Sequence, residues 1–150
     1  MGEKAKVLVV DDEAVVRESY LRSLAGVNYR VRTALDAEEA IRLMEAESFD
    51  VVLVDIRMPG MDGISLLREI KTRWPESEVV VVTGYPTIES AKEAVRLGAY
   101  NYLTKPIGPR EIQEAAGSAL LQKRWSLKKD RSSGSAAGEG RFEYRYPWEN

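Results

Sequence analysis

The chain has 150 residues, 44% of them hydrophobic, which is enough for one packed core and hardly enough for two. It contains no cysteine and no histidine, which excludes disulfides, thiolate zinc sites, cysteine nucleophiles and imidazole bases. The net charge of -2, from 22 basic and 24 acidic residues, gives no general attraction to nucleic acid or to anionic membranes.

The amino terminus, MGEKAK, leads into an apolar run that is too short for a signal peptide. No stretch approaches the roughly 18 consecutive apolar residues of a membrane span. We therefore expect a cytoplasmic protein that contacts neither membrane nor nucleic acid directly, and any metal that it binds must take oxygen ligands.

Five short runs are predicted to be strands, and the first four are rich in β-branched residues. They are residues 6–10, 30–34, 50–54, 78–82 and 100–103. The first, third and fourth are almost continuously apolar, which is typical of strands buried on both faces of a parallel sheet. The second alternates between polar and apolar residues, which suits an edge strand.

Apolar residues with helical spacing follow each predicted strand. The stripes are Val16, Tyr20 and Leu24; Ala37, Ala40, Ile41 and Met44; Leu67, Ile70 and Trp74; Ile88, Ala91 and Val95; and Ile112, Ala116, Ala119 and Leu120. Asp36 and Glu39 form a variant of the capping box, and Pro109 suits the first turn of the last helix. Gly26 and Gly98 are expected to end the first and fourth helices.

Strict alternation of five strands and five helices predicts a doubly wound α/β domain with a five-stranded parallel sheet, the flavodoxin-like (βα)5 arrangement. In such folds ligands bind at the carboxyl ends of the strands. The polar residues at those ends are Asp11, Asp12, Asp55, Thr83 and Lys105.

Each of these residues also has an ordinary structural explanation. Asp11 and Asp12 could be a helix cap or a turn, Thr83 before Gly84 could simply end a strand, and Lys105 could be a solvated loop charge. Asp55 is less easily explained, because the sequence IRMPGMDG that follows it already supplies turn residues. These explanations leave the joint placement of three acids, a hydroxyl and an amine at one edge unexplained.

Together these side chains predict a phosphoryl-transfer site. Carboxylates brought together raise one another's pKa unless a cation lies between them, and Mg²⁺ prefers such oxygen ligands. Asp55 is the candidate nucleophile, which would form an acyl phosphate. Lys105 would offset the phosphoryl charge, and the Thr83 hydroxyl would donate a hydrogen bond to a phosphoryl oxygen.

The motifs VVDDE, DIRMPGMDG, VVTGY and YLTKPI, in this order over about residues 5–125, closely resemble the receiver domain of two-component response regulators. The resemblance implies that a histidine kinase or phosphotransfer protein phosphorylates Asp55. It also implies that Mg²⁺ binds to Asp11, Asp12, Asp55 and the backbone carbonyl of Arg57. Its partners would be that kinase and a downstream output domain or protein.

The same resemblance implies a switch, in which Thr83 and Tyr102 alter the surface made by the fourth helix, the fifth strand and the fifth helix. A homodimer could form through that surface. Tyr102 could equally be an ordinary core tyrosine, and the Lys105–Pro106 bond is similar to one that is cis in the family. The segment AVRLGAYNYLTKPI resembles receivers of transcriptional activators that carry an ATPase domain.

Beyond the receiver domain, expected at residues 1–125, we expect a flexible linker at 126–140 and an aromatic tail at 141–150. The tail places Phe142, Tyr144, Tyr146 and Trp148 at every second position. It could be disordered, or it could dock as a strand or in a groove.

Three alternatives compete with a phosphoryl-accepting relay that is not a turnover enzyme. A phosphohydrolase of the haloacid dehalogenase type would need a second aspartate where the chain has Arg57, and a nucleotide-binding fold would need glycines where it has DDEAVV. A phosphorylation-independent interaction module would keep the fold alone. The presence of every expected site residue favours the relay, whose loss of phosphate would be slow and self-catalysed.

Overall fold

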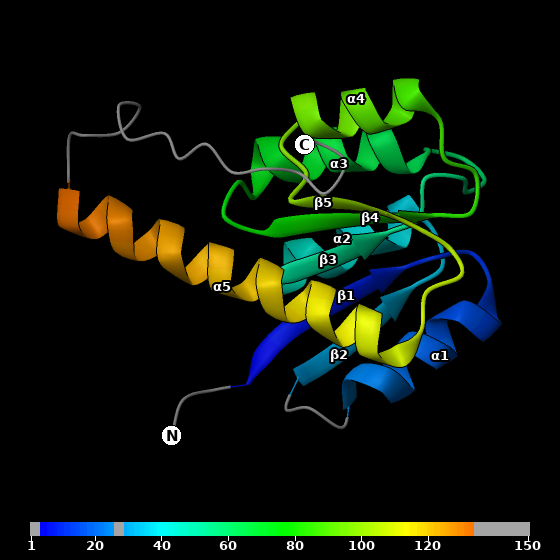
Figure 1. The fold of residues 1–150 in the computed structure, drawn as a ribbon, viewed down its shortest axis with the longest axis horizontal. Helices are drawn as coiled ribbons and strands as arrows, with labels where there is room; N and C mark the ends of the chain where they lie inside the picture. Colours follow the sequence, from blue (N-terminus) through cyan, green and yellow to red (C-terminus); the bar gives the residue numbers. More distant parts are fainter. Residues whose placement is uncertain (1–3, 26–28, 134–150) are drawn as a thin grey trace.

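The computed structural model describes residues 4–25 and 29–133, with side chains up to residue 128. The strands are β1 (Ala5–Val10), β2 (Tyr29–Ala34), β3 (Val51–Val54), β4 (Glu78–Thr83) and β5 (Asn101–Thr104). The helices are α1 (Ala14–Ala25), α2 (Ala37–Ala46), α3 (Gly63–Arg73), α4 (Ile88–Arg96) and α5 (Pro109–Ser133). All neighbouring strands pair in parallel, in the order β2-β1-β3-β4-β5, which confirms the predicted doubly wound α/β fold (Figure 1).

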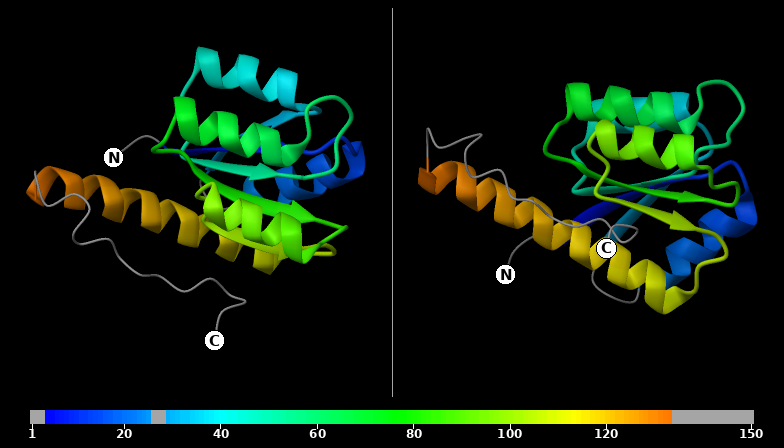
Figure 2. Two further views of the ribbon diagram at one scale, coloured as in Figure 1. Left: turned by 90° about the horizontal axis from the view of Figure 1, so that it is seen from above. Right: turned by 45° about the horizontal axis from the view of Figure 1, so that its top comes forward.

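Helices cover both faces of the sheet, α1 and α5 on one side and α2, α3 and α4 on the other (Figure 2). Every residue of β3 is buried, as expected of a central strand, because its side chains enter both apolar layers. The predicted edge strand β2 does lie at an edge, and its exposed residues alternate with less exposed ones.

The helix ends follow the sequence signals with two differences. Asp36 caps α2 by accepting from the Glu39 N–H, but the Glu39 carboxylate accepts from the N–H of Leu35, one residue before the cap. Gly98 ends α4 with a φ of 97°, a conformation that favours glycine. Ile88, expected on the buried stripe of α4, is 75% exposed because it occupies the first turn, beyond the sheet, and Ala94 is buried instead.

Residues 126–133, which were expected to belong to the flexible linker, are helical instead, because α5 continues to Ser133. The continuation is held to the sheet by Lys123, whose Nζ donates to Asp50 Oδ1 at 2.5 Å, a contact between residues 73 positions apart. The rest of the expected linker, the aromatic tail and Gly26 lie outside the described residues. No helix within residues 4–25 and 29–133, including α5, combines the length and the apolar character needed to cross a membrane.

Candidate functional site

Two buried carboxylates lie side by side where β1 and β3 end. The pairing of Val10 with Val54 brings the next residues of both strands, Asp11 and Asp55, to the same edge of the sheet. The Asp55 N–H donates to the Val10 carbonyl at 3.0 Å, and the two aspartates are only 2% and 6% exposed. The pattern of parallel strands therefore places both acids as predicted.

Asp12 completes a cluster of three carboxylates. One carboxylate oxygen from each of Asp11, Asp12 and Asp55 lies within 4.8 Å of the others, and Asp12 is the exposed member. Hard oxygen donors at this spacing fit a divalent cation such as Mg²⁺, which commonly binds one or two carboxylates and keeps several waters. The cluster can therefore hold a metal ion, with one side open to solvent.

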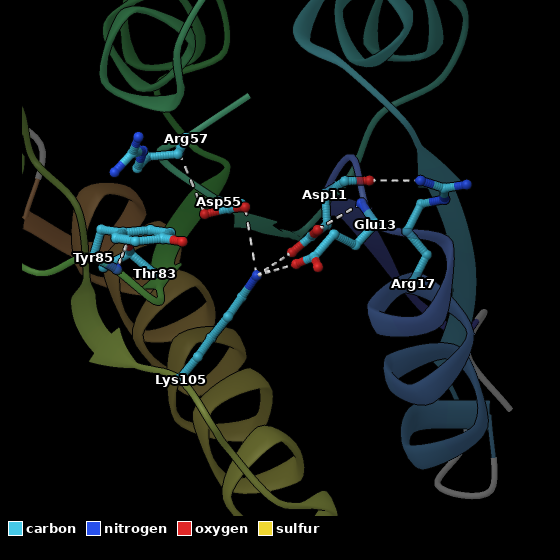
Figure 3. A network of polar contacts seen from close by, with 8 residues as sticks. All are labelled: Asp11, Glu13, Arg17, Asp55, Arg57, Thr83, Tyr85 and Lys105. Carbon is cyan, nitrogen blue, oxygen red and sulfur yellow. Dashed lines mark hydrogen bonds and ion pairs between the residues drawn. The ribbon is translucent and has the colours of Figure 1, made fainter. Parts of the chain in front are cut away.

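Lys105 reaches across the edge from the loop after β5 and points between the carboxylates (Figure 3). Its Nζ lies 2.7 Å from Asp11 Oδ2, 3.4 Å from Asp55 Oδ2 and 3.6 Å from Glu13 Oε1. The Lys105 N–H also donates to the Thr83 carbonyl at 2.8 Å, and the Lys105–Pro106 peptide is cis, as the resemblance implies. Lys105 is thus held in place both by its backbone hydrogen bond to Thr83 and by the carboxylates around its ammonium.

The other oxygens of the two buried carboxylates accept backbone hydrogen bonds. Asp11 Oδ1 accepts from Glu13 N at 2.9 Å, so Asp11 also makes the local turn that was its ordinary explanation. Asp55 Oδ1 accepts from Arg57 N at 3.3 Å. Both carboxylates are therefore held in a fixed orientation by the loops that follow them.

Burial and charge act in opposite directions on this cluster. Burial raises the pKa of the Asp55 carboxyl above its usual value, and Lys105 offsets this only in part. Burial disfavours the charged form of Lys105 too, but its hydrogen bond to Asp11 and the charges of Asp11 and Asp55 outweigh that cost and raise its pKa. The ammonium is thus secured in its charged form, whereas the charge on Asp55 remains disfavoured.

Thr83 lies beside Asp55 at the end of β4 and is fully buried. Its hydroxyl oxygen accepts from the N–H of Tyr85 at 3.0 Å, which leaves the hydroxyl hydrogen for another acceptor. The Tyr85 ring, 63% exposed, lies under the guanidinium of Arg57, 4.1 Å from its centroid. Figure 3 shows these side chains on one side of Asp55, with Asp11 on the other.

Tyr102 is buried on β5, with its hydroxyl at the start of α4. The hydroxyl forms a 2.5 Å hydrogen bond with Ser90 Oγ and accepts from the N–H of Thr87 at 3.3 Å. Thr87 and Ser90 themselves form the capping box of α4. Tyr102 therefore packs as an ordinary core tyrosine and also contacts the end of α4 that is nearer the site, and the sequence analysis missed both capping residues.

Three further residues that support the site were missed. Arg17 Nη1 on α1 donates to the Asp11 carbonyl at 2.8 Å, and Tyr20, buried beneath the cluster, has a pKa raised to about 12, chiefly by burial. Gly63 begins α3 so close to β3 that a Cβ there would lie 2.2 Å from the Asp55 carbonyl oxygen. The turn residues Asp62 and Gly63 signalled a loop, but nothing in their spacing showed this close approach.

Comparison with known proteins agrees with this geometry. Residues 7–117 match the response regulator receiver domain family. The chain is 39% identical over 125 residues to the transcriptional regulatory protein ZraR of Klebsiella oxytoca, covering 83% of this chain and 28% of that protein. It is 38% identical over 121 residues to the DNA-binding transcriptional regulator NtrC of Escherichia coli (strain K12), covering 81% and 25% respectively.

Among solved structures, the receiver domain protein (CheY-like) of Methanospirillum hungatei JF-1 superposes with a TM-score of 0.80 at 30% identity, covering 82% of this chain and 98% of that one. The chain spans about a quarter of the length of the two curated relatives. Both relatives are transcriptional regulators by name, which agrees with the resemblance found in the sequence. The chain belongs to the response regulator receiver domain family, and it is a phosphoryl-accepting domain of the two-component type.

Proposed function

We propose that Asp55 is the residue that accepts the phosphoryl group, from a phosphohistidine of a sensor kinase or a phosphotransfer protein. An Asp55 carboxylate oxygen would attack phosphorus as the phosphorus–nitrogen bond of the donor breaks, which leaves an acyl phosphate on Asp55. The observation that carries this proposal is the position of Asp55 within the carboxylate cluster and 3.4 Å from the Lys105 ammonium.

Asp11, Asp12, Asp55 and the backbone carbonyl of Arg57 would hold Mg²⁺, which when bound neutralises charge on the phosphoryl oxygens. Lys105 would supply a second positive charge, since its Nζ lies 3.4 Å from Asp55 Oδ2. The Thr83 hydroxyl, whose oxygen already accepts from Tyr85, donates to a phosphoryl oxygen. The chain then acts as a relay, with slow self-catalysed loss of the phosphoryl group and no diffusing substrate.

Thr83 and Tyr102 form the proposed switch. Tyr102 contacts the start of α4 through Thr87 and Ser90, so a shift of Thr83 toward the phosphoryl group can change the packing between β5 and α4. Phosphorylation would act as a shift in population between two arrangements of the surface made by α4, β5 and α5. A downstream output domain or protein, or a second copy of the chain, would read that surface.

The relay would work in the cytoplasm with a histidine kinase as its phosphoryl donor, and this chain itself would bind neither nucleic acid nor membrane. The net charge of -2 supports this assignment, since it provides no electrostatic attraction to polyanions. The residues after Ser133 are proposed as a linker and an aromatic tail.

Intact-mass measurement after incubation with phosphoramidate and Mg²⁺ tests the proposal. The native chain should gain one phosphoryl group in a metal-dependent reaction, and Asp55→Ala should gain none. Asp62→Asn is a matched control, because asparagine keeps the α3 cap and Asp62 lies in the loop after Asp55. Failure of the native chain to gain mass, with its fold intact and Mg²⁺ bound, would favour a phosphorylation-independent interaction module.

A further inference from the structure

A hollow lies at the amino edge of the sheet, between the second half of α5 and the start of β4. Its volume is about 370 Å³, at the small end of the roughly 300–1,000 Å³ that ligand pockets span. The residues that line it are Pro75, Glu76, Glu78, Lys123, Ser126 and Leu127. None of them belongs to α4, to β5 or to the carboxylate cluster, and the hollow has room for an aromatic side chain.

The rim of the hollow is negatively charged. Glu76 is exposed, and it takes part in none of the ion pairs between described residues. Glu78 adds a second carboxylate, whereas Lys123 is already bound to Asp50 Oδ1 through its Nζ at 2.5 Å. An aromatic residue next to an arginine would complement this hollow, because the ring would fill it and the guanidinium would bind Glu76.

The tail, residues 141–150, supplies this combination. It begins with Arg141 and Phe142, and it is joined to Ser133, the last residue of α5, by residues 134–140. Leu127 lies six residues before Ser133, which is about 9 Å along a helix. The connecting residues span up to about 25 Å when extended and include three glycines, so the chain can turn and run back along α5 to the hollow.

We propose that the tail folds back along α5 of its own chain, places Phe142 in the hollow and pairs Arg141 with Glu76. A short flexible connection gives a tethered segment an effective concentration in the millimolar range. An intrinsic dissociation constant of about 1 mM is therefore sufficient for docking, and one aromatic side chain with one ion pair can supply it. The proposal rests on residues 141–150 acting as a tail and does not depend on the chemistry of Asp55.

Disulfide trapping in the full chain tests this docking. Ser126→Cys and Gly140→Cys together place a thiol in the lining and a thiol just before the tail, in a chain that otherwise contains no cysteine. With oxidised glutathione and dilute protein, this pair should form an intramolecular disulfide at least tenfold faster than Gly140→Cys combined with Ser118→Cys. Ser118 is the control because it is an exposed serine two turns earlier on α5, beside β5.

Variants of the tail separate docking from mere tethering. Phe142→Ser should slow the Ser126 disulfide about tenfold, whereas Trp148→Ser, which removes an aromatic residue farther along the tail, should leave its rate unchanged. Glu76→Lys and Arg141→Glu should each slow it about threefold at low salt, and the two together should restore it. Glu76 is exposed and the tail lies beyond the core, so circular dichroism should show an unchanged fold in every variant.

Three results would overturn the proposal. Equal rates for the Ser126 and Ser118 pairs would show that the tail has no preference for the hollow. A Ser126 disulfide that forms as fast with Phe142→Ser as without it would show that tethering alone brings the thiols together. A disulfide-linked dimer in place of the intramolecular product would show that the tail docks on a second copy of the chain.

Discussion

The two edges of the sheet at which the strands begin and end differ in how their charges are paired. At the amino edge, where the strands begin, the charged groups have partners close by. At the carboxyl edge, where the strands end, several carboxylates compete for one ammonium. At the amino edge Asp50 accepts from Lys6 N at 2.8 Å and from Lys123 Nζ at 2.5 Å. Lys71 Nζ donates to the carbonyls of Pro75 and Ser77, both at 2.9 Å. These contacts join the start of β3 to β1 and α5, and join α3 to the loop before β4.

At the carboxyl edge Asp11, Glu13 and Asp55 all pair with Lys105, and Asp12 adds a fourth carboxylate. Burial opposes the negative charge of Asp55 there. The same sheet therefore has one edge at which hydrogen bonds to Asp50 and from Lys71 join separate elements, although burial opposes the charges of Lys71 and Glu78, and one edge at which three carboxylates contact a single ammonium. The variants below test that difference, in order of decreasing effect.

Gly63→Ala should have the largest effect. The added Cβ would lie 2.2 Å from the Asp55 carbonyl oxygen and 2.6 Å from Ile56 Cα, so either α3 or the end of β3 must move. We expect a loss of about 3 kcal/mol in the free energy of unfolding, measured by urea denaturation, and weaker Mg²⁺ binding. Gly108→Ala is the control, because its Cβ would meet only a side-chain atom, at 3.5 Å. Equal stability of the two variants would show that α3 or the end of β3 can move at the carboxyl edge without loss of stability.

Neutralising one aspartate at each edge should change stability in opposite directions. Asp50→Asn should destabilise the fold by about 1–2 kcal/mol, because it weakens the bonds to Lys6 and Lys123. Asp55→Asn in metal-free buffer at pH 7 should stabilise it by about 1 kcal/mol. The pKa of Asp55 is raised on folding, so its favourable contribution exists below the unfolded pKa and is lost as pH rises through the folded pKa.

The gain in stability from Asp55→Asn should accordingly vanish in acid, because the Asp55 carboxyl is then protonated in both the folded and the unfolded chain and is as neutral as asparagine. Saturating Mg²⁺ should reverse the order of stability, because a cation that binds only the folded native chain stabilises it by roughly 1.4 kcal/mol per tenfold excess over its dissociation constant. Thermal unfolding with EDTA or with Mg²⁺ measures both effects. Destabilisation by Asp55→Asn without metal would contradict the contrast between the edges.

Arg17→Met should weaken Mg²⁺ binding about fivefold while changing stability little. Arg17 Nη1 holds the Asp11 carbonyl at 2.8 Å, and loss of this bond leaves the loop that carries Asp11 and Asp12 less well positioned. Isothermal titration calorimetry with Mg²⁺ measures the change. Arg22→Met, an exposed arginine in the last turn of the same helix, should bind Mg²⁺ like the native chain.

Glu78→Gln should give the smallest effect, a gain of about 0.5 kcal/mol at pH 7. Burial raises the pKa of Glu78 on folding, and Lys71 and Lys123 offset this in part. Its contribution is favourable below its unfolded pKa and is lost as pH rises through the folded value. The gain should therefore be absent near pH 3 and appear on the alkaline side of the folded pKa. A loss of stability at pH 7 would show that the amino edge depends on this carboxylate as well.

The sequence was sufficient for the sheet and for the residues at its carboxyl edge, because both depend on local signals. A β-branched run followed by a polar residue marks where a strand ends, and parallel pairing then brings Asp11, Asp55 and Lys105 together. The roles of these residues in phosphoryl transfer remain predictions. The residues that support the site could not be predicted, because their contacts depend on helix placement. Nothing local links Arg17 to the Asp11 carbonyl or Tyr102 to Ser90.

The length of α5 also could not be predicted from local sequence signals. Ser126 to Ser133 were expected to belong to the linker, but they continue α5, which Lys123 joins to Asp50 at the amino edge of the sheet. A contact between residues 73 positions apart leaves no trace in helical periodicity.

In mechanical terms α5 is a stiff rod, about 37 Å long for its 25 residues. It begins just after the loop that carries Lys105, crosses the domain to the contact of Lys123 with Asp50, and extends past the sheet (Figure 1). A single helix thus joins the loop that carries Lys105 to Asp50 at the opposite, amino edge of the sheet.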